Sequence, residues 1–149
     1  MTSQASRVVP NQRGERIKVH GGWLSFLAVG DQTNGAYALI EAANDPSTGV
    51  RLHVHEREDE TWFILEGEYV FQVGSQIISA HAGDYVFGPR NVPHSYANRS
   101  ASLARALIMV TPAGFEGFWR ESARLGPDVA AHATLGLKYG VKFVANRED

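Results

Sequence analysis

The sequence of 149 residues contains no cysteine, which excludes a disulfide framework and a metal site built on thiolates. It also has no apolar run near the roughly 18 residues that a membrane-spanning helix requires. The formal net charge of -2 offers no broad basic surface for nucleic acid or anionic membranes. The N-terminal stretch is polar and lacks the apolar centre of a signal peptide. We therefore expect a cytoplasmic protein with neither nucleic acid nor membrane as a partner.

Length and composition indicate one folded domain. A chain of this size buries a substantial core, and its 44% hydrophobic and 20% charged residues are ordinary for a globular protein. We expect a single domain over residues 1–149, with a β-barrel over about 17–112 and C-terminal helices over about 113–140.

The first two thirds of the chain have the pattern of an all-β protein. Short runs rich in β-branched and aromatic residues alternate with turn-forming residues, as at 44–49 and 82–84. Gly74-Ser75 has the form of a two-residue hairpin turn between two such runs. Strands of about four to seven residues, with turns every 8–12 residues, predict a β-sandwich or barrel.

The pattern changes after Thr111-Pro112. Apolar residues then recur at helical spacing from Phe115 to Leu125, which predicts a helix that ends at Gly126-Pro127. Asp128 can cap a second helix that runs to about Lys138. Residues 141–144 predict a short closing strand.

Three histidines and one glutamate are candidate metal ligands. His53 and His55 are two residues apart in a predicted strand, so their side chains point to the same face. Glu60 follows shortly, and His94 lies about forty residues further on. Nitrogen and oxygen donors of this kind suit one divalent transition metal, with positions left for water or substrate. The ligand types do not distinguish Fe, Mn, Co, Ni, Cu and Zn.

The spacing around these residues resembles the first motif of the cupin family, Gly-x5-His-x-His-x3,4-Glu-x6-Gly. Gly49, His53, His55, Glu60 and Gly67 stand at its positions. Only three residues separate the first glycine from the first histidine, instead of five, and this alters the entry into the strand while the ligand spacing is kept.

A second segment resembles the second cupin motif, Gly-x5-Pro-x-Gly-x2-His-x3-Asn. Gly83, Pro89, His94 and Asn98 match at the required spacing. Asn91 replaces the motif glycine, and asparagine also tolerates a positive φ in a turn.

The resemblance implies an all-β fold, the double-stranded β-helix or cupin jelly-roll barrel, here with a short C-terminal helical extension. It also implies that His53, His55, Glu60 and His94 meet at the open end of this barrel and bind the metal there. Cupins commonly form dimers, and jelly rolls leave strand edges that pairing can cover. We therefore expect a homodimer, formed through exposed sheet surface or exchanged N-terminal strands.

The segments around the motifs resemble the quercetin 2,3-dioxygenase-like branch of the cupins. The stretches EREDETWFILEGEYVFQVG and VTPAGFEGFWRE, and the closing Tyr-Gly-Val-Lys-Phe, are typical of that branch. The resemblance implies a metal-dependent dioxygenase acting with O2 on a small phenolic, flavonol-like or enolic hydroxy-ketone substrate. Glu60 is then both a metal ligand and the catalytic proton acceptor.

Two other functions are compatible with the same residues. A metal acting as a Lewis acid without O2 would give an isomerase, cyclase or decarboxylase of a small metabolite. A non-catalytic cupin would use the site only to bind a small ligand. The metal and its redox state separate these classes, and the sequence specifies neither.

Strand alternation provides candidate substrate contacts, because four further side chains share a face with the predicted ligands: Arg51, Trp62, Ile64 and Tyr96. Arg51 either meets an acidic or anionic partner inside the barrel or lies at its rim. Core packing also explains Trp62 and Ile64, and a single β-bulge would reverse any of these assignments.

The residues next to the site have simpler interpretations. Glu56 and Glu58 are expected to be solvated charges beside the ligands. Phe115, Phe118 and Trp119 are expected to pack over the barrel mouth or a sheet face rather than to contact substrate.

Overall fold

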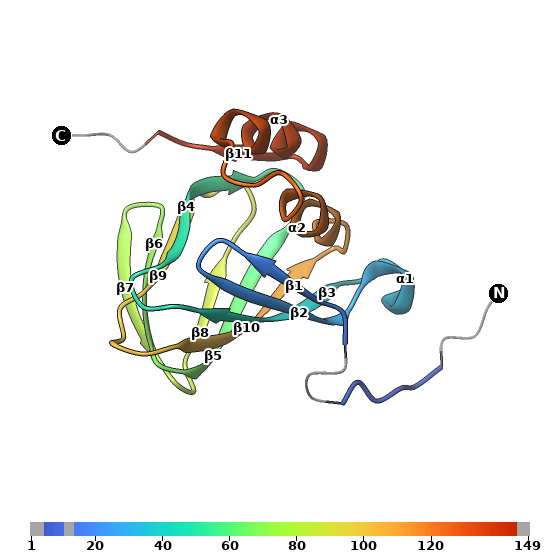
Figure 1. Ribbon diagram of the computed structural model, residues 1–149, viewed down its shortest axis with the longest axis horizontal. Helices are drawn as coiled ribbons and strands as arrows, with labels where there is room; N and C mark the ends of the chain where they lie inside the picture. The colour runs from blue at the N-terminus through green and yellow to red at the C-terminus, as the bar shows by residue number, and fades with distance from the viewer. Residues whose placement is uncertain (1–4, 11–13, 146–149) are drawn as a thin grey trace.

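Two antiparallel sheets that face each other form the body of the computed structural model, which describes residues 5–10 and 14–145 (Figure 1). The six-stranded sheet contains, in spatial order, β1 (Arg16–Val19), β2 (Gly22–Ala28), β3 (Ala38–Asn44), β10 (Ala104–Thr111), β5 (Asp59–Glu66) and β8 (Tyr85–Gly88). The five-stranded sheet contains β11 (Val141–Phe143), β4 (Gly49–His55), β9 (His94–Asn98), β6 (Glu68–Val73) and β7 (Gln76–His81). The predicted all-β double-stranded β-helix is confirmed.

The core lies between the sheets because the strands alternate buried inward residues with more exposed outward residues. In β10, every second side chain from Ala104 to Val110 is buried. Large rings fill the middle of the barrel: Trp62, Tyr69 and Phe71 are each at most 1% exposed. The interior is therefore a packed core rather than an open channel.

Hydrogen bonds of buried polar side chains close the barrel at the end remote from the histidines. The buried amide of Asn98 donates to the carbonyl oxygens of Asn44 (3.0 Å) and Ser102 (2.9 Å) and accepts from the Ser100 N–H (2.7 Å). The hydroxyl of Tyr69 donates to the Asn44 side chain at 2.8 Å. The motif asparagine thus holds connecting segments together, because buried backbone carbonyls need a donor.

The predicted turn positions adopt left-handed backbone conformations. Asn91 has φ 64° and Gly67 has φ 85°, so asparagine replaces the motif glycine without loss of the turn. Gly49 serves another purpose, because a Cβ there would overlap the backbone of Tyr96 on β9. Glycine at this position allows the two strands to approach closely.

Within residues 5–10 and 14–145, three short helices accompany the strands: α1 (Gly30–Thr33), α2 (Glu116–Ser122) and α3 (Val129–Tyr139). Helix α1 is a single helical turn between β2 and β3. Asp128 caps α3 by accepting from the Ala131 N–H at 3.1 Å, and Gly140 ends the helix with φ 68°. Within the described residues, no helix combines the length and apolar character needed to cross a membrane.

Helix α2 is shorter than the predicted Phe115–Leu125 helix. Its last turn tightens, because the N–H groups of Arg124 and Leu125 bond three residues back, to Glu121 (3.1 Å) and Ser122 (3.1 Å). Such i→i−3 bonds end an α-helix rather than extend it.

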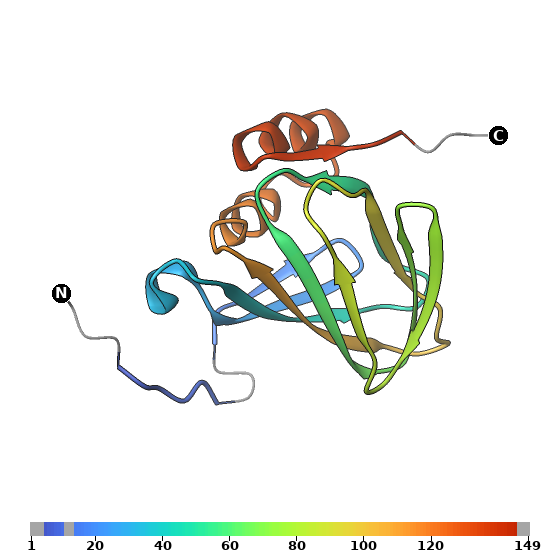
Figure 2. The ribbon, with the colours of Figure 1, turned by 180° about the vertical axis from the view of Figure 1, so that it is seen from behind.

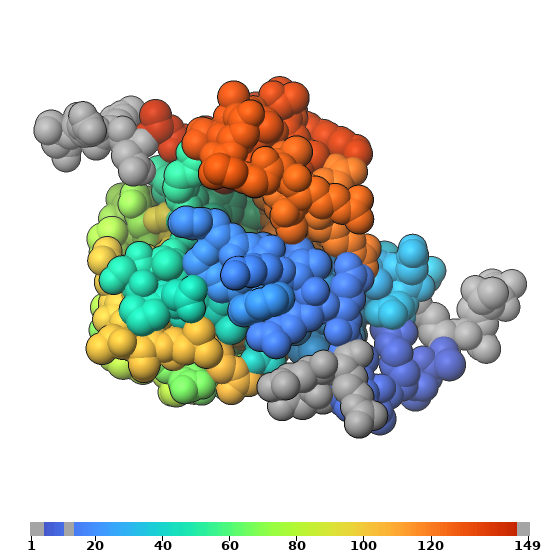
Figure 3. All heavy atoms as spheres, viewed as in Figure 1, coloured from blue at the N-terminus to red at the C-terminus, as the bar shows by residue number. Residues whose placement is uncertain are grey.

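The C-terminal segment covers one end of the barrel. Figures 1 and 2 show α2, α3 and β11 lying together over the end to which β4 leads. In the space-filling view, the orange and red atoms of this segment sit directly on the barrel (Figure 3). A second apolar cluster joins it to the strands, and its buried members are Ala38, Val110, Phe115, Phe118 and Val141.

Candidate metal centre

Four side chains from three strands converge beneath this C-terminal cover. The last residues of β4 supply His53 and His55, the second residue of β5 supplies Glu60, and the first of β9 supplies His94. One donor atom from each lies within 4.8 Å of all the others. The residues are 5%, 1%, 4% and 1% exposed, respectively, so the cluster is almost closed to solvent.

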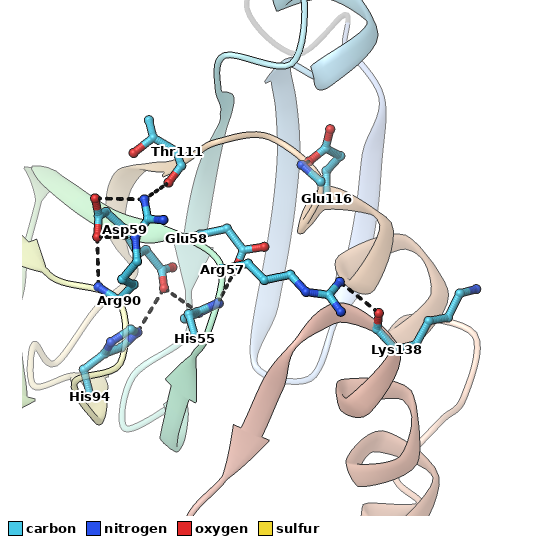
Figure 4. A network of polar contacts seen from close by, with 11 residues as sticks. His55, Arg57, Glu58, Asp59, Arg90, His94, Thr111, Glu116 and Lys138 are labelled. Atoms are coloured by element: carbon cyan, nitrogen blue, oxygen red, sulfur yellow. Dashed lines mark hydrogen bonds and ion pairs between the residues drawn. The ribbon is translucent and has the colours of Figure 1, made fainter.

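The carboxylate of Glu60 lies between two imidazoles. Its Oε2 atom is 2.9 Å from His55 Nε2 and 2.9 Å from His94 Nε2. Figure 4 shows the two histidines, with Glu58 beside His55. His53 lies directly opposite His94 in the β4–β9 ladder, and their ring centroids are 4.4 Å apart. The strand register therefore determines the geometry of the cluster, and all four predicted ligands come together.

Hydrogen bonds on the outer ring nitrogens orient two of the histidines. His53 Nδ1 lies 2.7 Å from the Arg51 carbonyl oxygen, which can only accept, so Nδ1 carries the proton. His55 Nδ1 lies 3.3 Å from Glu58 Oε2. Protonation at Nδ1 leaves Nε2 as the donor atom, the usual arrangement for a metal-binding histidine held by an outer carbonyl or carboxylate.

Glu58 is the residue on which the sequence interpretation was wrong. It was expected to be a solvated charge, but it is 4% exposed and its carboxylate faces His55. The chain bends at Glu56 and Arg57 after β4, and this bend turns Glu58 inward while Glu56 stays exposed and pairs with Lys142 at 2.7 Å. The only sign in the sequence that Glu58 contacts the cluster is its position three residues after the predicted ligand His55.

The cluster combines neutral imidazole with a retained negative charge. Burial, together with the neighbouring His94, lowers the pKa of His53 to about 3, so this ring is neutral at neutral pH. Burial opposes protonation of His55, but Glu60 and Glu58 outweigh it and raise its pKa to about 9. Burial would also raise the pKa of Glu60, but His55 and His94 hold it below its usual range, so Glu60 is a carboxylate.

These residues fit a divalent metal. Buried His55 Nε2 has no hydrogen-bond partner of acceptable geometry among the described residues, although it faces Glu60 Oε2. A bound cation would supply the partner that this nitrogen lacks and would balance the charge of Glu60. Without a cation, a proton on His55 balances that charge. Metal–ligand bonds of about 2.0–2.2 Å place coordinating atoms roughly 3 to 4.4 Å apart, close to the separations in the cluster.

Trp62 and Tyr96 form the inner wall behind the ligands. The Trp62 ring lies 5.0 Å from that of His94 and 5.9 Å from that of Tyr96. Burial and the nearby Glu60 raise the pKa of Tyr96, which is therefore a neutral phenol. Gly88, opposite Glu60 in the sheet, is a further site residue that sequence reasoning missed: a Cβ there would lie 2.9 Å from Trp62 and 3.3 Å from His94 Nδ1.

The other two candidate contacts lie in the core and at the rim of the barrel, respectively. Ile64 is fully buried in the main core, four positions along β5 from Glu60. Arg51 is exposed at the barrel rim because the β4–β9 register shifts between Val50 and His53. This bulge breaks the strand alternation that would have turned Arg51 inward.

Aromatic residues of the C-terminal segment cover the outer side of the cluster. The Phe115 ring lies 4.4 Å from His55, and the Phe143 ring lies 6.0 Å from His53. Two surface hollows of about 250 and 290 Å³ lie elsewhere, beside Val29 and Arg120, and none of the four cluster residues lines either of them. The chemistry of the donor atoms, rather than the size of a hollow, thus marks the site.

Comparison with known proteins shows the family of the segment that holds these residues. Residues 43–110, which hold His53, His55, Glu60 and His94, match the cupin domain family. The oxalate-binding protein of Thermotoga maritima is 31% identical over 102 residues, which span 66% of this chain and 83% of that protein. The chain belongs to the cupin family.

Two further cupin relatives differ in how much of their length is shared. Quercetin 2,3-dioxygenase of Bacillus subtilis is 25% identical over 113 residues, which span 76% of this cupin but only 33% of the dioxygenase. This cupin thus matches about a third of that relative's length. A structure described as a predicted oxalate decarboxylase from Thermotoga maritima superimposes with a TM-score of 0.63 at 28% identity, covering 71% of this chain and 99% of that one.

Proposed function

We propose that this cupin binds one divalent transition metal through His53, His55, Glu60 and His94 and catalyses dioxygenation of a small phenolic, flavonol-like or enolic hydroxy-ketone substrate. The observation that carries the proposal is the position of Glu60, a buried carboxylate 2.9 Å from two imidazole nitrogens. Such a carboxylate can act both as a ligand and as a proton acceptor at the same centre. The 25% identity to quercetin 2,3-dioxygenase supports the reaction class.

The residues of the site have separate roles in this reaction. When bound, the metal lowers the pKa of the substrate hydroxyl and allows the substrate anion to react with O2. Glu60 accepts the hydroxyl proton on its carboxylate, and the adjacent His55 and His94 lower its pKa, so that it is ionised until then. Both oxygen atoms of O2 enter the products and the substrate supplies all the electrons, so no separate reductant is required.

We propose that Trp62 and Tyr96 line the substrate site on the side that faces the barrel core. Buried Trp62 Nε1 has no hydrogen-bond partner among the described residues, which leaves one donor in this wall. A substrate oxygen that accepts from it would satisfy a group that is otherwise costly to bury.

Oxygen consumption tests the reaction class. Protein stripped of metal and reloaded separately with Fe, Mn, Co, Ni, Cu or Zn is mixed with flavonols and enolic diketones in an oxygen electrode. We expect uptake with a redox-active metal, and at least a 100-fold loss of turnover in Glu60→Gln, as is typical when a catalytic base is removed. Metal content is measured for each sample. If Glu60→Gln lost its metal together with its turnover, the result would show only that Glu60 is a ligand.

Binding without turnover is the second candidate function, and the 31% identity to an oxalate-binding protein favours it. Buried imidazoles around a metal can hold a small dicarboxylate without oxidising it. Tight oxalate binding to the metal-loaded protein, with no oxygen uptake on any substrate, would move the assignment to this class. Substrate conversion without oxygen uptake would instead indicate an isomerase, cyclase or decarboxylase.

We also propose that the cupin forms a homodimer through the outer face of its six-stranded sheet. Phe63, Tyr85 and Phe87 are 43%, 63% and 49% exposed on the neighbouring strands β5 and β8. Half-buried Leu107 lies opposite Phe63 and extends this apolar patch. An uncharged patch at a sheet edge can pair with a copy of itself across a twofold axis.

Light scattering tests this assembly. Phe63→Glu places a charge in the patch and is expected to shift the molar mass from dimer to monomer, because burying an unpaired carboxylate is costly. Ile77→Glu on β7 is the matched control, since Ile77 is 69% exposed on the other sheet. A monomeric wild-type protein, or a Phe63→Glu dimer, would contradict the proposal.

A further inference from the structure

The metal cluster is closed on both sides by aromatic rings. Trp62 and Tyr96 pack against the inner side, in the main core. Phe115 and Phe143 lie over the outer side, and no cluster residue is more than 5% exposed. A substrate that reaches the metal must therefore take the place of one of these rings.

Phe115 is firmly held in its position. It is 4% exposed, stacks on Phe118 with centroids 4.9 Å apart, and contacts the Trp119 ring at 5.1 Å. Displacing it would break the second apolar cluster, which joins the C-terminal segment to the barrel.

Phe143 is the more weakly held ring. It is half-buried and ends β11, a three-residue strand at the edge of its sheet. Beyond it, one backbone hydrogen bond, from Val144 N–H to the Leu52 carbonyl (2.9 Å), holds the strand to β4. Strand ends with few neighbours open at much lower free energy than a core does.

The other end of β11 is fixed. Val141 is 1% exposed, and the Glu56 N–H donates to the Gly140 carbonyl at 2.8 Å. β11 can therefore open from Phe143 while Val141 stays in place, which would uncover His53 without disturbing α3.

The position that Phe143 occupies has two chemically different neighbours. One is His53 of the metal cluster, with ring centroids 6.0 Å apart. The other is the Arg51 guanidinium, 4.7 Å from the ring centroid. Among the residues that the structure describes, the cation next to this ring is Arg51, and no ion pair joins it to a carboxylate. The position suits a flat ring that carries a negative charge.

We propose that β11 is a strap that opens at its Phe143 end, and that the ring of an aromatic or enolic anion replaces Phe143 next to His53 and Arg51. This inference rests on the proposed metal site and narrows the substrate to planar anions. Arg51 then acts as a specificity-determining residue, because it contacts the substrate's charge from the rim side.

Calorimetric binding of three probes to the metal-loaded protein tests the inference: salicylate, an aromatic anion; benzyl alcohol, a neutral aromatic compound; and oxalate, an anion without a ring. Phe143→Ala is expected to bind salicylate roughly three- to tenfold more tightly, because the binding-competent open state is no longer a minority population. Arg51→Gln is expected to weaken salicylate about tenfold and to leave benzyl alcohol unchanged, since only the charged contact is lost. Val144→Ala is the matched control on the same strand end and is expected to bind all probes as the wild type does.

Two results would overturn the proposal. Weaker or unchanged salicylate binding in Phe143→Ala would show that the ring is a fixed wall. An equal loss of salicylate and benzyl alcohol in Arg51→Gln would show that Arg51 only supports the structure. Metal content is measured in each variant, and oxygen uptake does not enter the comparison. The strap can thus be confirmed while the dioxygenase proposal fails, and the reverse also holds.

Discussion

At the scale of single residues, Glu58 is a buried neighbour of the cluster that contacts one of its histidines. It is buried, and its carboxylate lies 3.3 Å from His55 Nδ1, on the far side of the ring from Glu60. An outer carboxylate fixes the tautomer of a histidine and makes its other nitrogen a better donor. Glu58 should therefore control how tightly His55 holds a metal.

Substitution Glu58→Gln keeps the shape of the side chain and removes its charge. We expect metal affinity to fall roughly 10- to 100-fold, as is typical when such an outer partner is lost. Equilibrium dialysis with elemental analysis measures the affinity. Glu56→Gln is the matched control, since Glu56 is exposed and pairs with Lys142 instead. Equal affinities for the two variants would exclude this role for Glu58.

The sequence predicted the inner residues of the site better than the surrounding ones. His53, His55 and His94 lie at regular positions in uninterrupted stretches of strand, where spacing alone indicates a shared face. Arg51 and Glu58 lie at irregular points, a bulge and a bend, respectively. Local backbone irregularities of this kind depend on neighbouring strands, so spacing in one sequence does not reveal them.

At the scale of elements, the ends of α3 were predictable because they depend on local chemistry. Asp128 bonds the Ala131 N–H, and Gly140 adopts φ 68°, as residues of these types do at helix ends. The position of α3 against α2 was not predictable, because it depends on packing. Gly117 shows this: a Cβ there would lie 2.6 Å from the Tyr139 ring. A glycine is the only sign of this close contact between α2 and α3 in the sequence.

The cap of α3 can be tested separately from the metal cluster. Asp128→Ala removes the acceptor for the Ala131 N–H, and we expect the free energy of unfolding to fall by about 1 kcal/mol. Asp128→Asn keeps an acceptor and should stay close to wild type. Urea denaturation measures the stability of each variant. Metal affinity should not change in either, because α3 supplies no cluster residue; a loss of affinity in Asp128→Ala would show that the two are coupled.

At the scale of the whole molecule, the barrel and its metal cluster depend on each other only in part. The main core is built from apolar side chains such as Ile40, Phe71 and Ile108, which lie between the sheets. The cluster occupies one end, where β4, β5 and β9 begin or stop. The fold should therefore persist without a metal, while a bound metal adds stability at this end.

Metal removal tests this division. A ligand that binds only the folded state adds about 2.7 kcal/mol at a concentration of 100 times its Kd, which raises Tm by roughly 5–10 °C in a chain of this size. We expect a chelator to lower Tm by such an amount while the far-ultraviolet circular dichroism stays that of a β protein. His55→Ala should fold, bind little metal and show no shift with chelator, because its loss removes one donor and leaves the core in place. Complete unfolding on chelation would contradict this, since it would make the cluster, and not the apolar interior, the main source of stability.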